Sequence, residues 1–343
     1  MGIISRIFQK AQKGGNAPQE APRLEVVLAA PGPAAGLWTI GGGKGGVGKS
    51  LIASNMGVLL SKSGHRVLLV DADLGASNLH TFLGMDGGRL SLSSFLNNKV
   101  AEIADLVSKT SIPNLDLISG ARDSLDIADA GSDKIEKLKA ALGTLDYDYI
   151  LMDVGPGTAS NMLDLFLSGD EGILVTTPEP TSIENTYRFI KCLILRRMRN
   201  VINSHGDLEL KGLLKRIFEN PEWSLKVKTV ADIIRHLKEL DSERGETLRR
   251  LMGDTSISVV VNFVRRQEDE ALGAAVSRAC QDYFGVDIRA AGYIASEDCV
   301  AESIRLRRPL VNEYPSSRAA ASIEACLNGV IGPRARRATK AGA

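Results

Sequence analysis

Residues Gly41–Ser50 read GGGKGGVGKS, and this stretch decides the fold. Its later part, Gly43–Ser50, matches GxxxxGK(S/T), a pattern in which glycines let successive backbone N–H groups point at phosphate oxygens. An apolar run, Leu37–Ile40, predicts a strand before the loop, and Lys49–Ser63 predicts a helix after it. Because the N-terminus of a helix attracts anions, this strand, loop and helix predict a phosphate-binding site.

The loop carries side chains suited to a nucleoside triphosphate and its metal. Lys49 can reach the β- and γ-phosphates, and the Ser50 hydroxyl can ligate Mg²⁺. Lys44 is a second lysine, placed five residues before Lys49. The predicted nucleotide contacts in the loop are Gly43, Lys44, Gly45, Gly46, Val47, Gly48, Lys49, Ser50 and Leu51.

Apolar runs of strand length alternate with helical patterns along most of the chain. Their near-continuous Val, Ile and Leu content is typical of strands buried on both faces. The alternation predicts an α/β fold with a doubly wound, mostly parallel sheet, in which ligands lie beyond the carboxyl ends of the strands. The expected strands are Leu37–Ile40, Arg66–Val70, Leu115–Ile118, Tyr149–Val154, Gly172–Thr176, Ser258–Val264 and Gly292–Ile294.

Carboxylates follow two of these strands. Val70–Leu74 reads VDADL, and strand alternation sends Asp71 and Asp73 to the same side. One of them can support Mg²⁺ through its waters, and the other can position an attacking water. Tyr149–Thr158 reads YILMDVGPGT, a Walker B pattern in which Asp153 would hold Mg²⁺ through water and the glycines permit a mobile loop.

With Lys44 in place, the run KGGVGKS resembles the MinD/ParA family of deviant Walker A P-loop ATPases. In that family the signature lysine reaches across a dimer to the partner's nucleotide, as an arginine finger does. The resemblance implies ATP and Mg²⁺ as cofactors, weak ATP hydrolysis and an ATP-dependent homodimer. It implies catalytic roles for Lys44, Lys49 and Asp73, and metal roles for Ser50, Asp71 and Asp153.

The family's base-recognition elements fall at the ends of two later strands. Thr176–Thr181 reads TTPEPT, and Val261–Val264 reads VNFV. We expect the Asn262 amide to read the adenine edge, while Pro178 and Glu179 line the base or the ribose. The alternative for Asn262 is a cap at the end of its strand.

The region Gly292–Ile323 (GYIASEDCVAESIRLRRPLVNEYPSSRAAASI) resembles the flagellar-number regulators called FlhG or FleN. This resemblance implies a switch that controls the position or number of a cellular structure, such as a flagellum or a division site. We expect residues 1–36 to form an amphipathic segment and a flexible linker. Residues 37–332 would form the ATPase domain, with a helical insertion at about 196–254 that covers the sheet or docks a partner, and residues 333–343 a basic disordered tail.

Two surfaces are candidates for ATP-controlled attachment. Ile3, Ile4, Ile7 and Phe8 share one helical face, so residues 2–13 could bind a membrane weakly, and two copies in a dimer would bind it better. A disordered leader or a partner-docking helix is the alternative. Nonspecific DNA binding is less favoured, and its arginine patch would contain Arg265, Arg266, Arg305, Arg307, Arg308 and the arginines of the C-terminal tail.

Composition restricts the remaining classes. The chain has 42 Lys+Arg and 41 Asp+Glu, so its net charge of +1 gives no overall attraction to nucleic acid or membrane. The four cysteines form no CxxC pair, which disfavours an iron–sulfur carrier of the same fold. Without an apolar run of about 18 residues or a signal peptide, the sequence predicts a cytoplasmic protein, peripheral on the inner face of the membrane if residues 2–13 bind there.

Overall fold

The computed structural model describes residues 36–73, 77–87, 90–120, 132–219, 229–253 and 256–341. The predicted membrane segment, residues 2–13, lies outside the described residues, as does nearly all of the predicted linker.

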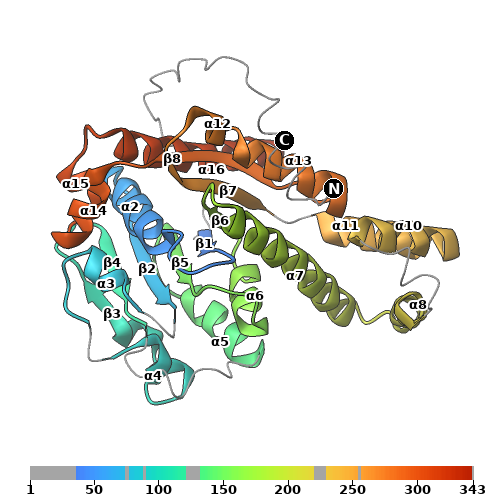
Figure 1. The fold of residues 1–343 in the computed structure, drawn as a ribbon. Helices are drawn as coiled ribbons and strands as arrows, with labels where there is room; N and C mark the ends of the chain where they lie inside the picture. Colours follow the sequence, from blue (N-terminus) through green and yellow to red (C-terminus); the bar gives the residue numbers. More distant parts are fainter. Residues whose placement is uncertain are drawn as a thin grey trace.

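The described residues form one sheet of eight strands in the order β3-β4-β2-β5-β1-β6-β7-β8 (Figure 1). All neighbouring strands are parallel except β3 and β4. This arrangement confirms the predicted fold class. The strands are β1 (Gly36–Gly41), β2 (Val67–Ala72), β3 (Val107–Lys109), β4 (Leu115–Ile118), β5 (Tyr149–Val154), β6 (Glu171–Thr176), β7 (Ile257–Val264) and β8 (Arg289–Ala295).

Helices cover both faces of the sheet because strand side chains alternate between them. In β2, Leu69 packs in a core cluster with helices α2 and α16, while Leu68 and Val70 pack in another with α4 and α5. The helices are α2 (Lys49–Lys62), α3 (Leu79–Phe82), α4 (Leu92–Leu96), η1 (Ile103–Leu106), α5 (Ser132–Leu142), α6 (Ser160–Leu167), α7 (Pro180–His205), α8 (Leu208–Glu219), α10 (Val230–Leu240), α11 (Ser242–Gly253), α12 (Gln267–Glu270), α13 (Leu272–Phe284), α14 (Asp298–Arg305), α15 (Leu310–Glu313) and α16 (Arg318–Ala341).

Three helices, α8, α10 and α11, stand between α7 and β7, where the sequence predicts a helical insertion (Figure 1). The segment Arg196–His205 is not part of it, because α7 continues to His205 and ends at Gly206, whose φ of 73° suits glycine. Leu210, Ile233 and Leu248 place their side chains in the same apolar cluster as α6, α7 and α13. The insertion is therefore packed on the domain through a shared core.

The C-terminal helix α16 differs from the expectation of a disordered tail over residues 333–343. Its backbone is helical from Arg318 to Ala341, beyond Gly332. Ala, Arg and Lys in this stretch favour a helix, whereas Gly332 and Pro333 oppose it, so composition alone does not account for the continuous helix. Within the described part of the chain, the helices are all too short or too polar to cross a bilayer.

Candidate nucleotide-binding site

The loop Gly41–Ser50 connects β1, in the middle of the sheet, to α2. Two of its glycines have left-handed backbone angles, with φ of 76° at Gly46 and 95° at Gly48. A Cβ atom on Gly43 would lie 2.3 Å from the Asn185 carbonyl oxygen of α7. The loop can therefore follow this path only with glycine at these positions, which leaves its N–H groups close to any bound anion.

Helix α2 begins directly after Gly48 and adds a second attraction for anions. Its first intrahelical hydrogen bond runs from the Ile52 N–H to the Gly48 carbonyl at 3.0 Å, so the preceding N–H groups have no acceptor within the helix. The first turn contains no acidic residue. Lys49 lies here and is only 6% exposed, so its charge acts at the phosphate loop.

Asp153, at the end of β5, faces the start of α2. The Ser50 hydroxyl donates a hydrogen bond to Asp153 Oδ2, while Asp153 Oδ1 is buried without a partner among the described residues. Burial raises the pKa of Asp153 to about 7, with a smaller contribution from the nearby charge of Asp71. Ionisation of this carboxylate therefore costs free energy unless a cation or a hydrogen-bond donor binds it.

Asp71 lies beside Asp153, because the two residues are direct register partners on β2 and β5. Its Oδ2 accepts hydrogen bonds from the Ser77 hydroxyl at 2.7 Å and the Leu79 N–H at 3.0 Å. Burial raises the pKa of Asp71, and these hydrogen bonds oppose that effect. Asp71 therefore organises the chain that follows β2, and its predicted support of Mg²⁺ through water stays a prediction.

Asp73 lies where the chains after β2 and β5 meet. A Cβ atom on Gly155 would be 3.3 Å from Asp73 Oδ1, and the Asp73 N–H donates to Asp71 Oδ1 at 3.1 Å. The Gly157 N–H reaches the Gly42 carbonyl at 3.4 Å. The structure therefore brings Asp73 and the predicted sensor loop together at the edge of the phosphate loop.

Lys44 is held by the start of α7. Its Nζ lies 3.3 Å from Glu179 Oε2 and 3.5 Å from the Thr181 hydroxyl oxygen. Both ends of the ion pair are exposed, 41% for Lys44 and 67% for Glu179. Glu179 thus contacts Lys44 of its own chain here, and the predicted contact of Pro178 and Glu179 with base or ribose stays a prediction.

Asn262 is buried against the loop, with 1% of its surface exposed. Its Nδ2 donates to the Val47 carbonyl at 2.9 Å, and its Oδ1 accepts from the Phe263 N–H at 2.9 Å. The amide therefore ties β7 to the phosphate loop in this state, and the predicted reading of the adenine edge stays a prediction.

Sequence reasoning missed Phe263, which follows Asn262 and is 38% exposed. Its φ of 59° is unusual for a bulky residue, and it falls where the β7–β8 register is irregular. Its ring tip would lie 3.9 Å from a Cβ on Gly48. The only available signal was an aromatic residue beside the predicted base-reading asparagine, because a backbone angle cannot be read from one sequence.

Three of the arginines proposed for DNA contact form ion pairs with carboxylates of the chain. Arg308 lies 3.1 Å from Glu313, Arg305 lies 3.5 Å from Glu302, and Arg307 lies 3.5 Å from Asp86. These ion pairs lower the local positive charge, which weakens the case for a DNA-binding patch.

Known proteins share this architecture. A family profile described as the CobQ/CobB/MinD/ParA nucleotide binding domain matches residues 38–310. The septum site-determining protein MinD of Helicobacter pylori is 30% identical over 207 residues, which cover 57% of this chain and 73% of that protein. A putative MinD of Oltmannsiellopsis viridis is 32% identical over 178 residues, which cover 51% of this chain and 52% of that protein. The chain thus aligns with between about half and three quarters of these relatives.

Solved structures agree on the fold. MinD from Pyrococcus horikoshii, complexed with Mg-ADP, has a TM-score of 0.58 at 24% identity, covering 86% of this chain and 96% of that chain. A putative plasmid partition protein from Borrelia burgdorferi, bound to AMPPNP, has a TM-score of 0.56 at 19% identity, covering 87% of this chain and 99% of that chain. With this fold, this phosphate loop and a family profile that spans most of its length, the chain belongs to the CobQ/CobB/MinD/ParA nucleotide-binding family.

Proposed function

We propose that the chain is a Mg²⁺-dependent ATPase that works as a switch. It binds ATP, dimerises around it, hydrolyses it slowly, and so controls the position or number of a cellular structure. The observation that carries this proposal is the buried, unpartnered Oδ1 of Asp153 beside Ser50, at the start of α2. Family membership supports the nucleotide, and the relatives named for septum placement and plasmid partition support a positioning role.

The residues around Ser50 fit a Mg²⁺ ion. A hydroxyl and the carboxylates of Asp71 and Asp153 are hard oxygen donors of the kind that Mg²⁺ prefers. The unpartnered Asp153 Oδ1 is a buried polar atom, which costs free energy until it is satisfied. Bound Mg²⁺ supplies neutralising charge to the phosphate oxygens.

Three side chains then have separate roles. Lys49, buried at the first turn of α2, holds the phosphate charge. Asp73 orients the attacking water beside the loop that contains Gly155. Lys44 lies at the surface, so it can leave Glu179 and approach the nucleotide of a second copy, where its positive charge stabilises the transferring phosphoryl group.

Calorimetry and light scattering test this proposal together. Wild type is expected to bind ATP with a Mg²⁺-dependent heat and to become a dimer. Lys49→Ala should lose the heat, whereas Lys44→Ala should keep ATP binding and lose turnover by about 10³-fold. Well-folded wild type that shows no Mg²⁺-linked heat with ATP would remove the proposal.

The resemblance of Gly292–Ile323 to FlhG or FleN supports a flagellum, a division site or a similar structure as the one that is regulated. A partition ATPase that associates with DNA is the second candidate. It requires DNA affinity that appears only with ATP and falls steeply with salt. An iron–sulfur carrier is disfavoured because the cysteines lie on four different helices: Cys192 on α7, Cys280 on α13, Cys299 on α14 and Cys326 on α16.

For location, we propose a cytoplasmic protein that attaches to the inner face of the membrane through residues 2–13 when ATP is bound. The N-terminal segment supports this because its apolar face and basic residues suit an anionic lipid surface.

A further inference from the structure

An apolar groove of about 380 Å³ lies between the C-terminal part of α7 and α8 of the insertion. Leu195, Met198 and Ile202 line it from α7, and Leu214 lines it from α8. The three α7 residues are spaced i, i+3 and i+7, so they lie along one face of that helix. Met198, Ile202 and Leu214 are 4%, 8% and 3% exposed and form the base of the groove, while Leu195 is partly exposed. The apolar α7 residues extend over about two helical turns.

The rim of this groove is basic. Arg199, Lys211 and Lys215 line it together with the neutral Asn203. Lys215 lies 3.7 Å from Glu219, an exposed pair that contributes little, whereas no carboxylate among the described residues comes within ion-pair distance of Arg199 or Lys211. A negatively charged binding partner would therefore be attracted to this rim more strongly than a neutral or basic one.

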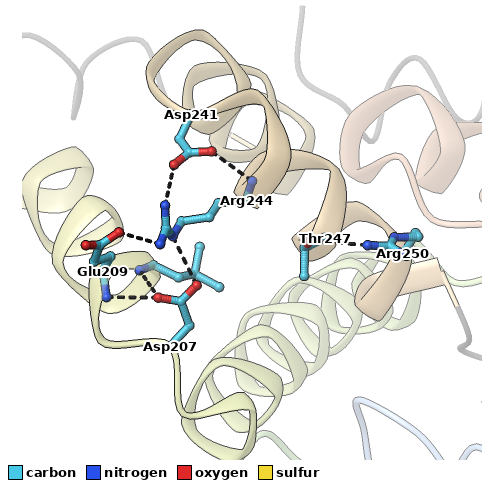
Figure 2. A network of polar contacts seen from close by, with 7 residues as sticks. Asp207, Glu209, Asp241, Arg244, Thr247 and Arg250 are labelled. Carbon is cyan, nitrogen blue, oxygen red and sulfur yellow. Dashed lines mark hydrogen bonds and ion pairs between the residues drawn. The ribbon is translucent and has the colours of Figure 1, made fainter.

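The α8 wall is fixed by a network centred on Arg244, which Figure 2 shows. Asp207 accepts the N–H groups of Glu209 and Leu210, both at 2.9 Å, at the start of α8. The same Asp207 carboxylate pairs with Arg244 Nε at 3.0 Å, and Arg244 Nη1 reaches Asp241 at 2.6 Å. Because α8 is already fixed to the turn between α10 and α11, binding of a partner would cost little conformational entropy in this wall.

We propose that this groove binds an acidic amphipathic helix of a partner protein. The apolar floor suits the i, i+3 and i+7 side chains of such a helix, and the basic rim suits carboxylates on its flanks. The chain's own N-terminal segment is a poor occupant, because Arg6, Lys10 and Lys13 would face the same positive charge. The surface lies between α7 and the insertion, and none of its lining residues belongs to the phosphate loop, so this inference goes beyond the switch function.

Two synthetic helical peptides test the proposal on the full chain. Both carry leucines at i, i+3 and i+7, and they differ only in having glutamates or lysines on the flanks. By fluorescence anisotropy, wild type is expected to bind the glutamate peptide with micromolar affinity that weakens with salt. The double variant R199E/K211E should lower that affinity by about 10-fold or more, because it reverses the rim charge.

Arg250→Glu is the matched control, because Arg250 lies on α11, where it donates to Thr247 (Figure 2), and it is not among the residues that line the groove. It should leave peptide affinity unchanged, and all variants should keep the circular dichroism and ATP affinity of wild type. The proposal is overturned if wild type does not bind the glutamate peptide, if it binds the lysine peptide equally well, or if R199E/K211E binds like wild type. Vesicles with anionic lipid give a further arm: binding to them that R199E/K211E loses, without peptide binding, would assign the groove to lipid instead.

Discussion

Asp153 couples the stability of the empty protein to pH. Its pKa rises from an ordinary 3.8 to about 7, mainly because it is buried. Between these values the unfolded chain has ionised Asp153 while the folded chain keeps the proton, so stability falls as pH rises and levels off above about 7. The buried carboxylate therefore lowers the stability of the empty protein at neutral pH, and it is placed where it can bind a cation.

Asp153→Asn should remove this dependence. Without Mg²⁺ and nucleotide, we expect the free energy of unfolding at pH 8 to be higher for the variant than for wild type, by on the order of 1 kcal/mol or more. The reason is that the asparagine side chain is neutral, whereas Asp153 must ionise while it is buried. Urea unfolding of both proteins at pH 5 and pH 8 measures this, and the advantage should shrink at pH 5. An equal difference at both values would contradict the assigned cause.

Asn262 allows its two possible roles to be separated. Replacing it with alanine leaves the buried Val47 carbonyl without its donor, which should cost about 1–3 kcal/mol of stability. If the amide serves mainly to hold the loop, Asn262→Ala lowers the affinities for ATP and GTP by the same factor. Calorimetric titration with both nucleotides decides this, since a selective loss of ATP binding would instead indicate that the amide reads adenine.

Besides its core contacts, helix α8 is tied to the α10–α11 turn by Arg244, so that side chain should contribute to the local stability of the insertion. In Arg244→Ala, Asp207, Glu209 and Asp241 lose their shared cation. We expect amide hydrogen exchange to speed up in α8 and in the α10–α11 turn, while the strands of the sheet stay protected. Arg250→Ala, which removes a matched arginine from α11, should leave the exchange of α8 unchanged, and equal effects of both changes would refute this role.

The parallel strands were predictable because each is a run of Val, Ile and Leu buried on both faces, as in Tyr149–Val154. Strand β3 was not, since Val107–Lys109 is short, partly exposed and paired only at the sheet edge. Motif order predicted that the phosphate loop, Asp71, Asp73 and Asp153 lie close together, because strand ends gather at one edge of a parallel sheet, and their roles stay predictions. The contacts of Lys44 with Glu179 and of Asn262 with Val47 depend on tertiary distances that no spacing in the sequence encodes.

The whole molecule should attach to membranes only as a pair, if residues 2–13 are the anchor. Each copy binds weakly, whereas two copies in one ATP-bound dimer act together and can gain about 10²–10⁴ in avidity. Deleting residues 2–13 should therefore abolish ATP-dependent sedimentation with anionic liposomes and leave ATP turnover unchanged. Unaltered sedimentation of the shortened protein would rule out this anchor.

Helix α7 joins two distant parts of this molecule without a break (Figure 1). It has 26 residues, and its rise gives a rod of about 39 Å from the residue after Glu179 to His205. A tilt of about 5° at one end of such a rod would carry the other end by about 3 Å. Because Lys44 contacts Glu179 at one end of this rod and the groove lies toward the other, we infer that loss of that contact would be transmitted along α7 to a partner in the groove.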